Sequence, residues 1–324
     1  MKQFNKHTTT LLLASLISIP TQAAVNMKDA SFIKTINDFK DFERTYNSRS
    51  LHDGIFGFGW CSAFEKKLEI AVNGQVTLKD CTQNTDTIYK NSVSSEGELL
   101  KFNDSKYIIS NRNQKMIFNK NGELINLNTA DGKKFALIYD QSGFLRKISN
   151  KKNILRLNYE YSNRKVKEII SSGLTIQHQY QEQNLLQSIH NNNEIYKYKY
   201  DKLHNLLEIQ YPDLSKENLT YDVETDRVNT FKNRKGCIDS FKYSQKENSM
   251  ISTLEKSCSQ KLISRVQFEF FEKIRNDGRS YIDKLTVTDG PLVKEITYDA
   301  FSGATKKVIQ KNALRMAANK GSYE

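Results

Sequence analysis

Residues 139–148 read YDQSGFLRKI, and variants of this stretch recur along most of the chain. Each copy joins an aromatic residue, a polar turn and an apolar segment that ends in Ile or Val. Tyr, Phe, Ile and Val favour strands, whereas Asp and Gly favour turns, so each copy of about twenty residues predicts one β-hairpin. The offset of three from Leu145 to Ile148 requires either a bulge or a strand buried on both faces, and both interpretations stay open.

The copies follow one another at a nearly constant interval. From Phe118 to Tyr243 the aromatic anchors recur at intervals of roughly twenty residues, and such a period is typical of repeat architectures. Because one hairpin alone is only marginally stable, the copies are expected to share one antiparallel sheet, with Tyr139, Tyr180, Tyr200 and Tyr221 on its packed face. The predicted repeat residues are Tyr139, Asp140, Gly143, Tyr161, Tyr180, Tyr200, Asp201, Tyr221, Asp222, Tyr298, Asp299 and Gly303.

The segment 1–23 has the layout of a secretory signal peptide. Residues 1–7 are polar and basic, residues 11–20 (LLLASLISIP) are apolar, and small residues precede a cleavage site expected after Ala23. The apolar run is shorter than the roughly 20 residues that a membrane-spanning helix needs, and we predict no transmembrane segment. The sequence therefore predicts export to the periplasm or to the cell exterior. Removal of Lys2 and Lys6 with the leader lowers the net charge from +12 to +10.

The chain after this leader contains four cysteines, Cys61, Cys81, Cys237 and Cys258. An even number fits an oxidising compartment, although four cysteines allow three connectivities. A hairpin turn at residues 247–248 places Cys237 directly opposite Cys258, within reach of a disulfide. Cys61 and Cys81 flank a second hairpin, but its turn at residues 73–74 sets Cys81 opposite Lys66, so this bridge requires a bend or a bulge. Zinc and a catalytic thiol are the less favoured alternatives, since no C-x-x-C pair is present.

A second motif precedes the repeats: FERTYNSRS at residues 42–50 and GIFGFGW at residues 54–60. Its glycines permit left-handed or closely approached backbone, and the single tryptophan is expected to be a buried anchor. We call it the leading motif, with key residues Arg44, Tyr46, Asn47, Ser48, Gly54, Gly57, Gly59 and Trp60. Together with the Tyr-Asp-x-x-Gly repeats, it resembles the RHS (rearrangement hotspot) or YD-repeat family over roughly residues 40–310.

The resemblance implies a long antiparallel sheet that winds into a spiral strip, which in large family members closes a shell around a C-terminal toxin. About nine hairpins, or about 18 strands spaced by about 4.8 Å, give a strip of about 90 Å. We therefore expect an all-β, elongated strip that does not close into a full shell. An enclosed toxin is not expected, because only residues 310–324 follow the repeats and the family's Asp-Pro-x-Gly self-cleavage segment is absent. The expected organisation is a signal peptide (1–23), a leading region with the first hairpins (24–115), the repeat strip (116–310) and a polar tail (311–324).

Residues that carry chemistry are few. His52 and Asp53 are adjacent in the chain and could form an acid–base couple, but no G-x-S-x-G, H-E-x-x-H or Walker A segment accompanies them. His178, His190 and His204 lie in adjacent repeats, where they either converge on a metal or acid–base site or serve as polar loop residues, the favoured interpretation. We predict no enzyme activity, no cofactor and no metal; an enzyme using His52 and Asp53 is the least favoured hypothesis.

The basic charge favours one class of partner over another. Lysines are spread through the repeats, and in residues 195–200 (IYKYKY) they alternate with tyrosines, so Tyr and Lys point to opposite faces of a strand. This pattern is typical of a solvated outer face rather than of a nucleic-acid platform, and an exported cation more plausibly meets an anionic glycan or lipopolysaccharide. The sequence predicts an exported structural or binding protein. The main alternative is a shell fragment or accessory component of a toxin system with a protein partner.

Overall fold

The computed structural model describes residues 23–82, 85–90, 93–94, 99–110, 114–191, 193–276, 280–301 and 303–312. The predicted leader lies outside these residues except for Ala23, and the predicted tail is described only for its first two residues. The described part is all-β as predicted: its one helical element is the single-turn 3₁₀ helix η1 (Ala63–Glu65). No helix among the described residues has the length and apolar character to span a bilayer.

Residues 23–66 form a small unit that we call the plug. Its sheet has the order β1-β2-β3-β6, with all pairs antiparallel, and a short ribbon of β4 and β5 adjoins it. The predicted cleavage after Ala23 would remove one residue of β1 and keep the Ala24–Ile33 and Val25–Phe32 pairs. The strands of the plug are β1 (Ala23–Val25), β2 (Phe32–Phe39), β3 (Phe42–Asn47), β4 (Asp53–Gly54), β5 (Gly57–Phe58) and β6 (Trp60–Cys61).

The remaining strands form one long antiparallel sheet, the strip, in which each strand pairs with its neighbours in the sequence. The first part contains β7 (Lys67–Ile70), β8 (Val76–Asp80), β9 (Thr85–Lys90), β10 (Val93–Ser94), β11 (Leu99–Asn103), β12 (Lys106–Ser110) and β13 (Lys115–Phe118). The repeats continue with β14 (Leu124–Asn128), β15 (Lys134–Tyr139), β16 (Leu145–Ser149), β17 (Ile154–Glu160), β18 (Lys165–Ser171), β19 (Leu174–Gln181), β20 (Asn184–His190), β21 (Glu194–Tyr200), β22 (Leu206–Gln210), β23 (Lys216–Tyr221) and β24 (Val228–Lys232). The last part contains β25 (Ile238–Gln245), β26 (Ser249–Cys258), β27 (Lys261–Ile274), β28 (Ser280–Asp289), β29 (Leu292–Tyr298) and β30 (Thr305–Asn312).

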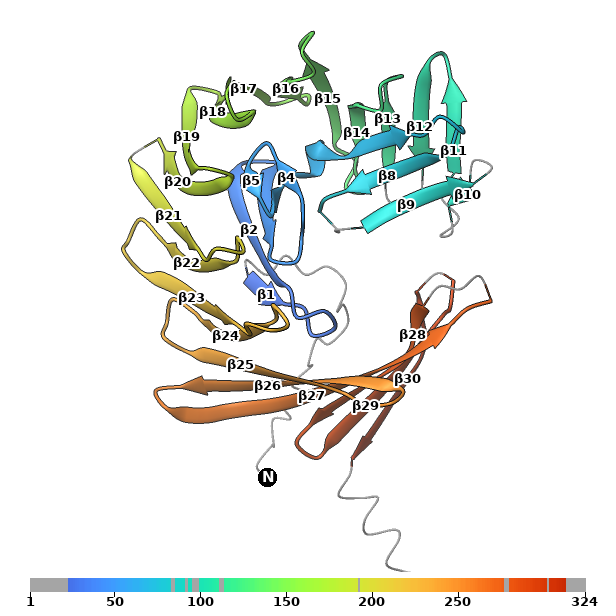
Figure 1. Ribbon diagram of the computed structural model, residues 1–324, viewed down its shortest axis with the longest axis vertical. Coiled ribbons are helices and arrows are strands. Elements are labelled where there is room, and N and C mark those ends of the chain that lie inside the picture. Colours follow the sequence, from blue (N-terminus) through green and yellow to red (C-terminus); the bar gives the residue numbers. More distant parts are fainter. Residues whose placement is uncertain are drawn as a thin grey trace, which may run out of the picture.

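The strip curves into an arc around the plug (Figure 1). Near its start it curls back on itself, because Lys67 bridges Glu123 and the Leu68 amide donates to the Gly122 carbonyl at 2.8 Å. At its other end, no strand pairing among the described residues joins β30 to β7. The strip is therefore open, as predicted. It contains more strands than the repeats alone predict, because pairing already starts at β7, well before the first repeat.

Most repeats carry a bulge at the aromatic anchor, whereas the hairpin of Tyr243 pairs in continuous register. Ile138 pairs with Lys147, but the next residue, Tyr139, pairs with Leu145, so Arg146 is the extra residue. The bulge turns Leu145 and Ile148 to the same face, and both are buried, which settles the alternative left open by their spacing. The same register shift occurs at the anchors Phe118, Tyr139, Tyr159, Tyr180, Tyr200, Tyr221 and Tyr298.

The anchor tyrosines also link successive repeats through one recurring hydrogen bond. The Tyr180 hydroxyl donates to the Val166 carbonyl at 2.8 Å, and Tyr221 bonds Leu206 in the same way at 3.2 Å. In the third copy the donor is Tyr159, which bonds Leu145 at 3.0 Å. Tyr161, the predicted anchor, lies beyond the end of β17 and is exposed. The repeat is thus anchored two residues earlier than its Tyr-Ser sequence indicates, because the strand ends at residue 160.

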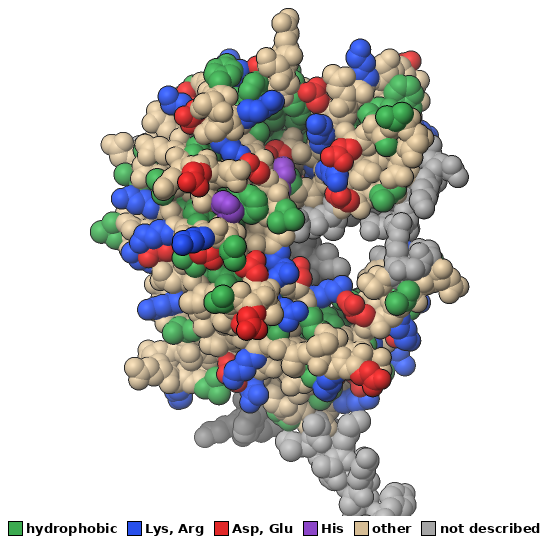
Figure 2. All heavy atoms as spheres, in the orientation of Figure 1, with side chains coloured by type: hydrophobic (Ala, Val, Ile, Leu, Met, Phe, Trp, Pro, Cys, Tyr) green, Lys and Arg blue, Asp and Glu red, His purple; other side chains and the backbone are tan. Residues whose placement is uncertain are grey.

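The strip separates apolar and charged side chains by face. In β21, Tyr198 is fully buried while Lys197 and Lys199 are exposed, in keeping with the alternation of a strand. Figure 2 shows Lys and Arg side chains scattered among Asp and Glu over the visible face, rather than gathered in one patch. This distribution is the one expected of a solvated outer face.

Candidate functional site

The centre of the plug is a buried ion pair from the leading motif. Arg44 on β3 and Asp38 on β2 are completely buried, and the guanidinium donates to the carboxylate through both Nε and Nη2. Nη2 also lies 3.2 Å from the hydroxyl of Ser188, on β20 of the strip. Burial disfavours the charge, but Asp38 outweighs it, so the pKa of Arg44 is raised above its ordinary value. The ion pair is therefore buried inside the arc, and its guanidinium contacts the strip at Ser188.

Aromatic residues of the leading motif surround this pair. Trp60 is fully buried, lies under the Arg44 guanidinium at 5.2 Å, and donates its Nε1–H to the Tyr200 hydroxyl at 2.8 Å. Tyr46 packs against Trp60 at 5.4 Å between ring centroids. Buried aromatic side chains with satisfied polar ends combine a large hydrophobic area with directional bonds. The leading motif thus supplies a large part of the plug's contact with the middle repeats.

The plug also bonds the backbone at the bulges. The Val166 amide donates to the Ile55 carbonyl at 2.8 Å, and the Leu206 amide donates to the Tyr46 hydroxyl at 2.9 Å. The Val228 amide donates to the Ala30 carbonyl at 3.3 Å. All three donors occupy the same position of the repeat, directly opposite an anchor tyrosine. Because a bulge leaves a backbone group without its ladder partner, the plug completes the hydrogen bonding of three of the repeat hairpins.

Two of the predicted histidines flank the buried ion pair. His178 is buried, its ring meets Phe56 edge-on at 5.8 Å, and neither ring nitrogen has a hydrogen-bond partner. Burial, followed by the charge of Arg44, holds the pKa of His178 well below its usual value. His190 Nε2 lies 3.7 Å from Asp38 Oδ1, and burial lowers its pKa as well. His178 is therefore a buried residue and His190 a partly buried one, both facing the plug rather than standing as polar loop residues.

The third histidine lies apart from these two. His204 stacks on Phe58 at 4.5 Å and bonds the Asn184 side chain at 2.9 Å. The histidines of adjacent repeats therefore do not converge on one point. This arrangement follows from the curvature of the strip, because each repeat meets a different part of the plug.

His52 and Asp53, the acid–base couple of the least favoured hypothesis, bond different partners. His52 Nε2 lies 3.1 Å from Glu65 Oε2, whereas the Asp53 carboxylate accepts from the ammonium of Lys165, on β18. Burial opposes protonation of His52, but the bond to Glu65 outweighs it and raises the pKa of the imidazole. Two residues adjacent in a strand-like segment point in opposite directions, which explains why the two side chains separate.

Gly54 is required by space rather than by backbone conformation. A Cβ atom there would lie 2.1 Å from Glu65 Oε2 and 2.2 Å from His52 Nε2. Gly57 and Gly59 instead have positive φ values of 96° and 75°, a region that favours glycine. The glycines of the leading motif therefore let the β4–β5 ribbon pass close to the strip and leave room for the His52–Glu65 pair.

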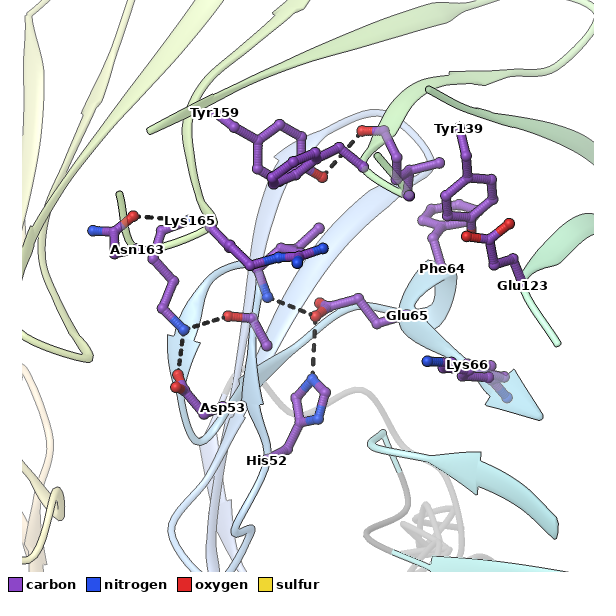
Figure 3. Close-up of a pocket in the computed structure, with 17 residues that line it drawn as sticks. His52, Asp53, Phe64, Glu65, Lys66, Glu123, Tyr139, Tyr159, Asn163 and Lys165 are labelled. Atoms are coloured by element: carbon purple, nitrogen blue, oxygen red, sulfur yellow. Dashed lines mark hydrogen bonds and ion pairs between the residues drawn. The ribbon is translucent and has the colours of Figure 1, made fainter. Parts of the chain in front are cut away.

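A cavity of about 450 Å³ lies beside this pair, between the plug and the hairpins β15–β18 (Figure 3). Its wall combines the rings of Tyr139, Phe144 and Tyr159 with the charged side chains of Lys67 and Arg164. The Arg164 guanidinium stacks on the Phe144 ring at 4.7 Å, and burial raises the pKa of Tyr139 above its ordinary value. The carboxylates of Asp53, Glu65 and Glu123 also line this cavity, so its wall combines aromatic rings with charges of both signs.

The structure contains two disulfides, one within a single hairpin and one between the plug and the strip. Cys237 and Cys258 join the ends of β25 and β26, whose register pairs Ile238 with Ser257 and so places the two cysteines opposite each other. Cys61 and Cys81 instead join the end of the plug to the end of β8. The predicted register of the hairpin before Cys81 is wrong by one residue, since Lys67 pairs with Lys79. Gly74, with φ +79°, closes a turn that takes one residue more than expected.

The other predicted residues hold turns and strand ends. Asp140 accepts from the amides of Ser142 and Phe144, and Asp201 and Asp222 bond their own turns in the same way. Asp299 accepts from the Phe301 amide, and both Gly143 and Gly303 have positive φ. Asn47 accepts from the Arg49 amide, and Ser48 Oγ accepts from the Phe32 amide. These residues chiefly shape local backbone.

Sequence reasoning missed four residues of the site: Asp38, Glu65, Lys165 and Ser188. All four are polar groups at positions that become buried only when the plug enters the arc. The sequence signals for them are weak, since each stands among ordinary polar residues. The FERTYNSRS segment does signal Arg44, but its partner Asp38 lies on the preceding strand, outside the motif.

Comparison with known proteins gives a partial match. A family model described as a domain of unknown function (DUF6531) matches residues 40–87, which include the leading motif and the first strands of the strip. No curated protein matches the chain. The solved structures that are similar in part include TcdB2-TccC3 without its hypervariable C-terminal region (TM-score 0.37, 13% identity), TcdB2-TccC3-TEV (0.34, 11%) and the Photorhabdus luminescens Tc holotoxin pore (0.31, 15%).

These three alignments cover 87%, 87% and 89% of this chain. The chain spans only 16%, 18% and 15% of the length of those structures. At TM-scores below 0.5, the likenesses establish neither a family nor an activity for this chain.

Proposed function

We propose that this protein is an exported scaffold of β-hairpin repeats, a shell-like component of a toxin system, whose open end holds a protein partner. The resemblance of the leading motif and the repeats to RHS proteins supports the toxin-system assignment. The plug supports a scaffold role, because it bonds several of the middle repeats from inside the arc. The observation that carries the partner proposal is the apolar row at the open end of the strip.

This row lies on the inner face of the strip. Ser252 on β26 faces the plug, since its hydroxyl donates to the Met27 carbonyl at 2.6 Å. Its cross-strand partner Phe268 shares that face, and Phe270, two residues further on, does so too. From Phe270 the row continues through directly paired residues on the next strands. These are Leu285 on β28, Ile296 on β29 and Val308 on β30.

Exposure rises abruptly where the row reaches the free edge. Leu285 and Ile296 are 2% and 6% exposed, whereas Val308 is 51% exposed. Within the described part of the chain, no further strand pairs with the outer edge of β30. Unpaired sheet edges are templates for an added strand. A polypeptide segment that pairs with β30 and places apolar side chains beside Val308 would continue both the sheet and the row.

A site-specific photocrosslinker tests this proposal. Placed at Val308 in the producing cells, it should yield an adduct with one other polypeptide, identified by mass spectrometry. The matched control is the same crosslinker at Val223, which is 93% exposed in the turn between β23 and β24 and should yield no such adduct. Adducts at neither position, together with a monomeric native mass, would overturn the proposed partner.

Export is tested separately by the N-terminus of the mature protein. The leader predicts a chain that begins at Ala24 in the periplasmic or extracellular fraction. An intact Met1 in protein recovered from the cytosol would contradict export and leave the fold untouched. A cytosolic location would also remove the setting in which both disulfides are expected to persist.

An anionic glycan is the second candidate ligand, and the aromatic and cationic part of the wall of the cavity beside the His52–Glu65 pair supports it. Lys67 is exposed at its rim, and Arg164 presents its guanidinium above Phe144. A sugar ring stacking on Phe144 or Tyr159 and carrying a carboxylate or sulfate would meet both the aromatic and the cationic groups. Lipopolysaccharide and acidic polysaccharides have this chemistry.

Heparin and lipopolysaccharide columns test the glycan proposal. The full chain should be retained at low salt and released as salt rises, and the double change Lys67→Ala with Arg164→Ala should abolish retention. The charge-matched control changes Lys235 and Lys242 to Ala, both away from the cavity, and should leave retention in place. Equal loss in both variants would mean that retention follows net charge and that the cavity is not the binding site.

A further inference from the structure

The Cys61–Cys81 disulfide has a histidine beside it. His52 lies in the loop before β4, Cys61 is the last residue of β6 in the plug, and Cys81 follows β8 of the strip. One ring nitrogen of His52 and the two sulfur atoms all lie within 4.8 Å of one another. Among the described residues, this is the one group of three His, Cys, Asp or Glu side chains with ligand atoms so close together. The chain brings them together from three separate segments, which explains why no C-x-x-C spacing announces them.

The surroundings of this disulfide contain further groups that a metal site can use. The Ser62 carbonyl oxygen lies 3.3 Å from Cys61 Sγ and 3.7 Å from Cys81 Sγ. The His52 imidazole is held by the Glu65 carboxylate, which is itself fixed by the amides of Ile55 and Ser62. A carboxylate that orients a histidine ring is a recurrent outer-shell feature of zinc sites.

The site is also accessible. A cavity of about 720 Å³ borders both His52 and Cys81, so that a small reductant and an ion can reach the sulfur atoms. Cys61 is buried, whereas Cys81 and His52 are partly exposed. The cavity therefore reaches the disulfide from the side of Cys81 and His52, and not from the side of Cys61.

We propose that, once this disulfide is reduced, His52, Cys61 and Cys81 bind a zinc ion. Two thiolates and one imidazole are a common three-residue zinc donor set, with Zn–S near 2.3 Å and Zn–N near 2.0–2.1 Å. A water molecule or the Ser62 carbonyl completes the tetrahedral coordination. Since the ligands come from the plug and from the strip, the ion would join the two parts as the disulfide does. The clasp between plug and strip then persists in both redox states, and this inference holds whether or not the protein acts in a toxin system.

The reaction balances with a phosphine as reductant. The phosphine takes up oxygen from water and becomes a phosphine oxide, and the disulfide receives the two electrons and the two protons. Zinc then displaces the protons of both thiols, which leave to solvent. A phosphine is preferred to a dithiol reagent because it offers no thiolate that competes for zinc.

The test measures zinc binding by the full chain, with zinc chloride added before and after treatment with tris(2-carboxyethyl)phosphine. Reduced wild-type protein should retain about one zinc per chain after gel filtration, and oxidised protein none. Cobalt(II) in place of zinc should give thiolate charge-transfer absorption in the reduced protein alone. His52→Ala should weaken binding at least tenfold, and Cys61→Ser with Cys81→Ser should abolish it.

The second disulfide is the matched control. Cys237→Ser with Cys258→Ser removes the same number of thiols but should leave zinc binding of the reduced protein intact. Circular dichroism shows whether each variant is folded. For His52→Ala, formation of the Cys61–Cys81 disulfide in the oxidised protein is a second sign of a correct fold. The proposal is overturned if reduced wild-type protein retains no zinc. It is also overturned if folded His52→Ala binds as tightly as wild type, or if loss of Cys237 and Cys258 abolishes binding.

Discussion

The repeats that face the plug and the C-terminal arm (β27–β30) are both antiparallel hairpins, yet they bury different groups. Against the plug, the middle repeats bury ionisable residues: Arg44 and Asp38 meet Ser188, and Lys34 meets Glu217 at 2.9 Å. The inner row of the arm is apolar and reaches a free edge at Val308. Both regions belong to the same curved strip. The middle repeats pack against the plug, whereas the inner row of the arm ends at an edge that no described strand covers.

The difference shows what specifies the docking of the plug. Apolar side chains can pack against one another in many registers. A buried ion pair or an unpaired amide finds its hydrogen-bond partners in only one register. Burial even lowers the pKa of Lys34 in spite of its partner Glu217, so these contacts are poor sources of net stability. We interpret them as fixing the position of the plug, a constraint that the apolar row of the arm lacks.

Of the changes proposed, removal of Arg44 should lower the stability of the plug and the middle repeats the most. Arg44→Met leaves the Asp38 carboxylate buried without its partner, and we expect a loss of about 3–5 kcal/mol in the free energy of unfolding. Urea unfolding measures it. Adding Asp38→Leu should recover part of the loss, because the double variant buries no charge. Lys242→Met, which breaks an exposed pair with Glu255, is the control and should change stability by less than about 1 kcal/mol.

Gly54→Ala should have the next largest effect. The new Cβ collides with the His52–Glu65 pair, and overpacking of this kind costs about 1–3 kcal/mol. The specific readout is the His52 titration followed by NMR, in which the raised pKa should move back toward 6.5. Gly132→Ala, in an open turn with positive φ, should destabilise the turn without moving the His52 titration. An unchanged His52 titration in Gly54→Ala would show that the pair tolerates the methyl group.

Loss of an anchor hydroxyl should have a smaller effect. Tyr180→Phe removes the bond to the Val166 carbonyl and should cost about 1 kcal/mol, the usual net value of one hydrogen bond. Tyr161→Phe removes an exposed bond to Arg146 and should cost less. Equal costs in urea unfolding would contradict the conclusion that Tyr161 is an exposed residue outside the series of anchors.

The pH dependence should be the smallest effect, because two kinds of histidine oppose each other. The pKa of buried His178 is lowered, so the unfolded chain binds its proton more readily, and stability falls as the pH drops below about 6.5. The pKa of His52 is raised, so its contribution is present at low pH and fades as the pH rises through its folded value. Thermal unfolding of His178→Phe should therefore show less destabilisation on acidification than wild type, while His52→Ala should show more. Identical pH profiles would contradict these assignments.

The hairpins of the strip can be predicted from the sequence, but the packing of the plug against them cannot. The regular spacing of the anchors and the alternation of IYKYKY suffice for hairpins with Tyr198 inside and lysines outside. The frame of the third repeat is mistaken because a Tyr-Ser pair resembles the Tyr-Asp anchors, although the strand ends one residue before it. The buried partners Asp38 and Glu65 are not predictable from spacing, because they meet Arg44 and His52 only through tertiary structure.

The same limit applies to the cysteines. A turn at residues 247–248 suffices to oppose Cys237 and Cys258, since both belong to one hairpin. Cys61 and Cys81 belong to different sheets, so hairpin symmetry does not describe their bridge. The proximity of His52 to this bridge depends on how the plug enters the arc, which a local pattern does not encode.

The central claim is that the plug and the middle repeats form one cooperative unit, joined where the plug bonds the amides of Val166, Leu206 and Val228. Native-state hydrogen exchange of the full chain tests it most directly. We predict that these three amides and strands β2 and β3 exchange at the same slow rate. Arg44→Met should accelerate them all together, while β28–β30 change little. Fast exchange of β2 and β3 while the three amides stay protected, or acceleration of the plug alone in Arg44→Met, would contradict the account.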